Sequence, residues 1–172
     1  NESLGSMNQT LPFRVMEDVA AVACGWWHTA AVRTDGSLWL WGDNRAGQLG
    51  NGIVGDQPSG HSWTDSVAGR PNTEPEPETL FHVMDGVAGV ACGETHTAAL
   101  KRDGTLWTWG SNFWGQLGSP AIPMREDCPT PTQVLDRVVA VSCGDNCTAA
   151  VRADGTLWMW GSIPAEPQEQ PT

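Results

Sequence analysis

The side chains best suited to chemistry in this chain are histidines and cysteines, and most of them stand at repeated positions. His28 and His96 each follow a Cys-Gly pair at the same spacing, and each precedes Thr-Ala-Ala. A histidine can ligate a metal or act as a base, but a metal site needs converging ligands, and the sequence shows no such spacing. We therefore predict that both histidines are structural hydrogen-bonding groups and that the chain holds no metal or other cofactor.

The five cysteines fall into two groups. Cys24, Cys92 and Cys143 share one repeated position inside short apolar runs, which predicts buried free thiols that pack as small hydrophobic groups. Cys128 and Cys147 lie outside that pattern. These two could be joined by a disulfide, although sequence spacing alone does not bring two cysteines together.

Nothing in the sequence is typical of an enzyme. It has no glycine-rich phosphate loop, no nucleophile elbow and no paired-carboxylate motif. A net charge of −11 with only 9 Lys and Arg residues argues against binding to nucleic-acid phosphates or to anionic membrane surfaces. No segment is apolar for long enough to span a bilayer. We predict a non-catalytic protein with no nucleic-acid partner and no membrane insertion.

Aromatic side chains are the remaining candidates for binding. Four of the ten tryptophans stand outside the repeated positions, and one of them follows a phenylalanine. Aromatic side chains in loops are favoured as interface anchors, with partial packing as the alternative. The candidate partner-binding residues are Trp26, Trp27, Trp63, Phe113 and Trp114.

A sequence repeat that occurs three times must position these residues. Leu-Trp-x-Trp-Gly ends at Gly42, Gly110 and Gly161, and a Cys-Gly and then an Asp-Gly precede it in every copy. Such a repeat indicates a repetitive architecture. The copies cover about residues 15–51, 83–118 and 134–161, with an insertion loop at about 52–78. Residues 162–172, rich in proline and polar side chains, are predicted to be a disordered tail that follows a three-repeat unit over residues 1–161.

Each copy has the pattern of short β-strands. In the first, residues 19–24, 29–33 and 37–41 are strand-like, and Asp35-Gly36 predicts a hairpin with a type I′ turn. In the strand over 37–41, the two tryptophans lie on one face and the two leucines on the other. Because both faces are apolar, we expect this strand to be buried between neighbouring sheets, with the six repeated tryptophans in the packing.

A further strand-like segment precedes each copy, at residues 11–15, 79–83 and 131–135. This makes about four strands per copy, and no helical period is sustained. The predicted fold is all-β, with three four-stranded blades of a β-propeller.

The combined motif resembles the repeat of the regulator of chromosome condensation family. It reads Val-x-x-Val-x-Cys-Gly-x-x-His-Thr-x-Ala, then Asp-Gly-x-Leu-Trp-x-Trp-Gly, then Asn-x-x-Gly-Gln-Leu-Gly, over residues 19–50, 87–118 and 138–161. The resemblance implies a propeller, usually of seven blades with about fifty residues each, that serves as a binding platform. The third copy departs from the pattern, because Cys147 replaces the histidine and the final Asn-x-x-Gly-Gln-Leu-Gly is missing.

In this family, the strand before each repeat closes the preceding blade. The resemblance therefore implies that residues 79–83 complete blade one and 131–135 complete blade two, whereas the strand of Leu11, Phe13 and Val15 has no blade to close. Two blade faces of roughly 300 Å² each would stay open. Since a monomer rarely exposes so much contiguous apolar surface, either two copies pair head to tail into a six-bladed ring, or the arc is part of a longer propeller.

The leading functional interpretation is a scaffold that binds another protein or its own copy. The family resemblance adds two alternatives, which are guanine-nucleotide exchange on a small GTPase and ultraviolet sensing by tryptophans. The second alternative rests on residues 25–29, Gly-Trp-Trp-His-Thr, which resemble the Gly-Trp-Arg-His-Thr setting of a plant photoreceptor. The Val-Ala-Cys-Gly stretches resemble bacterial relatives that are secreted or surface-attached, whereas free cysteines are typical of the cytoplasm. Localisation is therefore not determined, with a secreted or cell-surface bacterial protein favoured over a cytoplasmic one.

Overall fold

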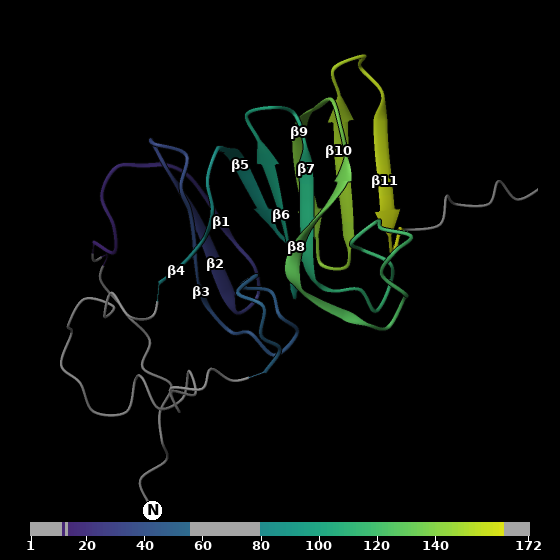
Figure 1. The fold of residues 1–172 in the computed structure, drawn as a ribbon, viewed down its shortest axis with the longest axis horizontal. Coiled ribbons are helices and arrows are strands. Elements are labelled where there is room, and N and C mark those ends of the chain that lie inside the picture. The colour runs from purple at the N-terminus through teal and green to yellow at the C-terminus, as the bar shows by residue number, and fades with distance from the viewer. Residues whose placement is uncertain (1–11, 13, 56–79, 164–172) are drawn as a thin grey trace, which may run out of the picture.

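Three antiparallel β-sheets stand side by side in a computed structural model of the chain (Figure 1). The structure describes residues 12, 14–55 and 80–163. Within these ranges there is no helix, and therefore none that is long and apolar enough to cross a membrane. We call the sheets blades 1, 2 and 3 in chain order.

The blades follow one pattern of antiparallel strands. Blade 1 has the order β1-β2-β3-β4, blade 2 the order β5-β6-β7-β8, and blade 3 the order β9-β10-β11. The innermost strands pack against one another, because β5 contacts both β1 and β9. The strands are β1 (Val19–Cys24), β2 (His28–Arg33), β3 (Leu38–Gly42), β4 (Phe81–Met84), β5 (Val87–Cys92), β6 (His96–Lys101), β7 (Leu106–Ser111), β8 (Asp127–Leu135), β9 (Val138–Gly144), β10 (Cys147–Arg152) and β11 (Leu157–Gly161).

The strand that precedes each repeat closes the blade before it. β4 pairs with β3 through Trp39 and His82, and β8 pairs with β7 through Trp107 and Gln133. This confirms the predicted exchange of strands between repeats. Blade 3 has three strands in the described part of the chain, so the outer strand that was predicted to be missing there is absent from that part.

The Asp-Gly hairpins differ from the predicted type I′ turn. Gly36 has a φ of +92°, but Asp35 is not among the residues with positive φ. The amide of Gly36 donates to the carbonyl of Arg33, and the amide of Arg33 donates to the carbonyl of Ser37, both at 2.9 Å. This is a three-residue loop with glycine in the left-handed position. The type I′ prediction was wrong because the Asp35 carboxylate accepts the Ser37 amide (2.8 Å) and holds the aspartate in a right-handed turn.

Two apolar layers between the blades form the core. Ala98 and Ala99, neighbours on β6, belong to different layers, so blade 2 is buried on both faces as predicted. The first layer contains Ala30, Val32, Leu38, Leu40, Leu49, Val87, Ala99 and Trp109. The second contains Ala98, Leu100, Leu106, Val138 and Ala150.

The outer faces of the row remain open. Leu38 and Leu106 are fully buried, whereas Leu157, the same residue at the same place in blade 3, is 64% exposed. The prediction that all six repeated tryptophans are packed was wrong for Trp158, which is 46% exposed on the edge strand β11. Cys24, predicted to be buried, is exposed because β1 has no blade beside its outer face in the described part.

Several predictions fall on residues that the structure does not describe. These are the positions of Trp63, Leu11 and Phe13, most of the insertion loop, and the tail beyond residue 163.

Candidate functional site

A hydrogen-bonded joint fixes blade 1 to blade 2. The Nε2 atom of His28 lies 3.0 Å from the Thr97 hydroxyl, which donates to the main-chain carbonyl of Gln48 at 2.9 Å. The indole Nε1 of Trp109 donates to the same carbonyl, also at 2.9 Å. The Thr97 hydroxyl donates its only hydrogen to the Gln48 carbonyl, so it must accept a hydrogen bond from His28. The His28 imidazole therefore carries its hydrogen on Nε2.

The same joint recurs between blades 2 and 3. His96 Nε2 lies 2.9 Å from the Thr148 hydroxyl, which donates to the Gln116 carbonyl at 2.9 Å. Trp160 Nε1 donates to this carbonyl at 2.9 Å. The prediction that the repeated histidines are structural hydrogen-bonding groups is therefore confirmed. The threonine and glutamine of the joint were not predicted from the sequence, although both recur at fixed places in the repeat.

The loop after β3 holds the Gln48 carbonyl in place through its own side chains. Asn44 Oδ1 accepts the amide of Leu49 at 3.0 Å, and Gln48 Oε1 accepts the amide of Ala46 at 2.9 Å. Gln48 Nε2 donates to Asp43 at 2.9 Å. The Asn-x-x-Gly-Gln-Leu-Gly motif thus encodes a self-supporting loop that presents one carbonyl to the next blade.

Burial keeps both histidines neutral. It lowers the pKa of His28 and of His96 to about 4, and Nδ1 of each ring has no hydrogen-bond partner. Each ring also lies directly against the glycine of its Cys-Gly pair, since a Cβ added at Gly25 or Gly93 would collide with it. The Cys-Gly-x-x-His spacing therefore makes room for an uncharged imidazole beside the glycine.

The thiols of Cys92 and Cys143 face the interior of the joints, whereas Cys24 is exposed. Burial raises the pKa of Cys92 and of Cys143 to about 12, so both remain protonated and unreactive at neutral pH. Among the described residues, no three His, Cys, Asp or Glu side chains gather as a metal site would require. Cys128 and Cys147 are not paired, because Cys128 lies on β8 of blade 2 and bonds to the Thr130 carbonyl instead (3.2 Å).

Four of the predicted partner-binding residues lie at one end of the strands. Trp26 and Trp27 form the turn between β1 and β2, and Phe113 and Trp114 lie in the loop after β7. All four are 47–56% exposed. We call this end, made of residues 25–27, 43–55, 93–95, 112–126 and 145–146, the loop face; it is the lower side in Figure 1.

Contacts within the loop face fix these aromatic side chains. Trp26 Nε1 donates to Asp145 at 3.2 Å, which connects a turn of blade 1 to a turn of blade 3. Phe113 and Trp114 meet edge to face with ring centroids 5.1 Å apart, and the Arg125 guanidinium lies over Phe113 at 5.2 Å. The exposed aromatic side chains are therefore held in defined orientations.

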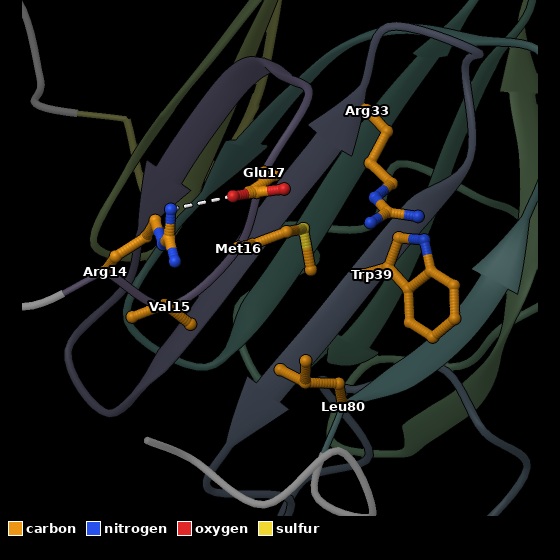
Figure 2. A pocket seen from close by; sticks show the side chains of 7 residues that line it. All are labelled: Arg14, Val15, Met16, Glu17, Arg33, Trp39 and Leu80. Atoms are coloured by element: carbon orange, nitrogen blue, oxygen red, sulfur yellow. Dashed lines mark ion pairs between the residues drawn. The ribbon is translucent and has the colours of Figure 1, made fainter. Parts of the chain in front are cut away.

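Val15, a residue of the predicted ring-closure strand, lies outside the strands of the structure. Together with Met16 and Leu80 it lines an open hollow of about 540 Å³ beside Trp39 (Figure 2). Arg14 and Glu17 form an exposed ion pair at its rim, 2.7 Å apart. Val83 of the outer strand β4 and Trp107, the equivalent tryptophan of blade 2, both pack against the first core layer.

Comparison with protein families agrees with this geometry. A model described as the regulator of chromosome condensation (RCC1) repeat matches residues 35–100 and 103–151, and a second model of the same description matches 19–48 and 87–116. The chain belongs to the regulator of chromosome condensation repeat family.

Similar proteins are much longer than this chain. The mitochondrial RCC1 domain-containing protein RUG3 of Arabidopsis thaliana is 33% identical over 90% of this chain and 33% of its own length. The ultraviolet-B receptor UVR8 of the same plant is 34% identical over 84% of this chain and 30% of its own. A crystal structure of Prp20p from Saccharomyces cerevisiae superposes with a TM-score of 0.64, at 26% identity over 84% of this chain and 33% of that one. The chain therefore spans about a third of the length of these relatives.

Removing the central hydroxyl of a joint should destabilise the fold. Thr97→Val leaves the His28 imidazole and one hydrogen-bonding site of the Gln48 carbonyl without their partner, so we expect a loss of about 1–3 kcal/mol of unfolding free energy. Thr29→Val is the matched control, since Thr29 holds the same register position in blade 1, which has no preceding blade in the described part of the chain. We expect that control to change by less than about 0.5 kcal/mol in urea denaturation. Equal losses in both variants would mean that the joint contributes nothing.

The buried histidines should also make stability depend on pH. Their folded-state pKa of about 4 lies below the ordinary 6.5, so the unfolded chain binds more protons between these values. The unfolding free energy should therefore be highest above pH 6.5 and fall by about 3 kcal/mol per histidine as the pH drops to 4. The turn aspartates act below this window, because hydrogen bonds from the residue two places on lower their pKa under 3.8. Denaturation at pH 7.5, 5.5 and 4.0 measures the effect, and a flat profile would contradict it.

Proposed function

We propose that this chain is a non-catalytic propeller scaffold that binds a partner protein through its loop face. The observation that carries this proposal is the gathering of Trp26, Trp27, Phe113 and Trp114 at one end of the strands, each about half exposed. Large aromatic side chains on a fixed backbone supply contact area at a small entropic cost, which is typical of binding surfaces. The solved relative Prp20p, whose structure was reported with its binding to Gsp1p and histones, supports a role in protein recognition.

Charge on the loop face favours a partner with basic groups. Glu126 and Asp145 are exposed there and Glu94 is partly exposed beside them, so these three carboxylates outnumber the two exposed arginines of the loop face, Arg45 and Arg125. The chain as a whole carries −11, so the long-range field also attracts a basic surface. Of the two alternatives, exchange activity predicts faster nucleotide release from a small GTPase, which a fluorescence release assay measures directly. Ultraviolet sensing is less favoured, because Glu94 and Asp145 replace Trp26 in the other two blades.

We also propose that the open blade faces are covered by a second copy of the chain, in a head-to-tail ring. Two observations support this. The outer face of blade 3 exposes Leu157 and Met159, and that of blade 1 exposes Val19 and Val22. Their counterparts inside the chain are packed between blades, so each open face matches one half of an interface that already exists twice.

Substitutions on the loop face should remove partner binding without disturbing the fold. In a cross-linking capture experiment, we expect the Trp26→Ser and Trp114→Ser variants to retain much less partner protein than the wild-type chain does. Each substitution removes an exposed aromatic anchor from the loop face. Trp158→Ser is the matched control, since Trp158 is similarly exposed but lies on β11 away from the loop face. Unchanged capture by the two loop-face variants, or equal loss in the control, would overturn the assignment.

A charge on the open face of blade 3 should dissociate the ring. In multi-angle light scattering we expect wild-type chain at twice its mass of 18.4 kDa, and Met159→Asp at the mass of the monomer, because the aspartate is desolvated in the interface. Met124→Asp is the control, since Met124 is exposed in the loop after β7. A wild-type monomer at high micromolar concentration would contradict the proposed self-association. It would not bear on the proposal that the loop face binds a partner.

A further inference from the structure

Each joint inside the chain brings a histidine and a cysteine to the same threonine hydroxyl. In the first joint, His28 of blade 1 lies 3.0 Å from the Thr97 hydroxyl, and the Cys92 thiol of blade 2 lies beside that hydroxyl and donates to the Ala23 carbonyl of blade 1 at 3.7 Å. In the second, His96 lies 2.9 Å and Cys143 lies 4.0 Å from the hydroxyl of Thr148. Each threonine hydroxyl is thus approached by the histidine of the preceding blade and by the cysteine of its own blade.

The strand register shows which residues would take the histidine and cysteine positions in a joint between blade 3 of one copy and blade 1 of another. The histidine position is the one opposite the last glycine of the repeat, as in His28↔Gly42, and in blade 3 it is taken by Cys147, opposite Gly161. The cysteine position is the one opposite the threonine, and in blade 1 it is taken by Cys24, opposite Thr29. A joint between the two open ends would therefore place two thiols around one hydroxyl.

The Cys147 side chain lies against the glycine of its repeat, as the histidine of an internal joint does. A Cβ added at Gly144 would come 2.9 Å from Cys147 Sγ, just as one added at Gly93 would meet the ring of His96. Cys24 is exposed on the outer face of blade 1. Blades 1 and 3 stand at opposite ends of the row in Figure 1, so Cys24 belongs to one end blade and Cys147 to the other.

A main-chain contact fixes the register of such a joint. The amide of Val87 donates to the Gly36 carbonyl, and the amide of Val138 donates to the Gly104 carbonyl, both at 2.9 Å. The third pair of equivalent atoms is the amide of Val19 and the carbonyl of Gly155, one at each open end. Pairing them across two copies repeats the spacing of the internal joints and carries Cys24 toward Cys147.

We propose that head-to-tail packing of two copies lets Cys147 of one copy form an intermolecular disulfide with Cys24 of the other, beside Thr29. This rests on the self-association proposed above and adds its chemistry, which is an oxidation-dependent lock. The lock compensates for hydrogen bonds that this joint lacks, because Cys147 replaces the histidine and the sequence after Gly161 does not continue with the glutamine-bearing loop motif. Two such disulfides close one ring of two copies.

The oxidant is a small disulfide such as oxidised glutathione. The thiolate of one cysteine attacks it, forms a mixed disulfide and releases one glutathione thiolate. The thiolate of the second cysteine then attacks the protein sulfur of the mixed disulfide and releases the second glutathione. One protein disulfide forms, one glutathione disulfide is reduced to two thiols, and the two protons lost from the cysteines reside on the products.

The full chain, reduced and then exposed to oxidised glutathione, tests the lock on a non-reducing gel. We expect a covalent dimer without a ladder of larger species, and a Cys24–Cys147 linked peptide in mass spectrometry. Cys24→Ser and Cys147→Ser should lose the band, whereas Cys128→Ser should keep it. Cys147→His should lose the disulfide but still run as a dimer in light scattering, because it restores the imidazole that the internal joints use.

Light scattering of the same samples separates the two proposals. A reduced dimer that never gives the linked peptide overturns the thiol lock and leaves self-association standing. A monomer under reducing and oxidising conditions overturns both. A disulfide that links other cysteines, or a ladder of higher oligomers, overturns the closed two-copy ring.

Discussion

One carbonyl oxygen per joint supports the whole arrangement of blades. The carbonyl of Gln48 accepts from the Thr97 hydroxyl and the Trp109 indole, and the next blade repeats this with Gln116. Apolar layers alone do not specify the register between sheets, since flat packing tolerates sliding. Two directional bonds to one buried acceptor do specify it, because a shifted blade would leave that oxygen and its donors unpaired inside the protein. The glutamine side chain, meanwhile, folds back to hold its own loop.

The joint also links the loop face to the core. The loop that carries Phe113 and Trp114 also contains Gln116, whose Oε1 accepts the Trp114 amide at 2.8 Å and whose carbonyl holds blade 3. The turn that carries Trp26 and Trp27 leads directly into His28, which holds blade 2. The exposed aromatic residues are therefore one to three positions away from buried groups that cannot move without breaking a joint. That proximity explains how short loops can keep large side chains exposed and still fixed in place.

Much of the fold was predictable from the sequence, whereas the joint was not. Period-two patterning and the repeated Cys-Gly, Asp-Gly and Leu-Trp-x-Trp-Gly elements were enough to predict the three blades, and the family resemblance implied the exchange of strands between them. The turn type was missed because it depends on where the Asp35 carboxylate bonds, which dipeptide statistics do not contain. The exposure of Cys24 and Trp158 was missed for a related reason: a repeat predicts equal burial for equal positions, but the ends of a row have fewer neighbours. The joint itself pairs Gln48 with Thr97, and no local pattern indicates that a main-chain carbonyl is the acceptor.

The size of the open faces favours the proposed ring over an open chain of copies. One face of a blade covers roughly 300 Å², so a single head-to-tail contact buries about 600 Å², which is below what a specific interface needs. Closing a ring of two copies forms two contacts at once and brings the total to about 1,200 Å², at the lower bound for stable association. The second contact also forms within one complex, so it carries no further cost of bringing two molecules together. An interface at this bound stays reversible unless something else holds it, and a pair of thiols at each contact is the kind of group that can.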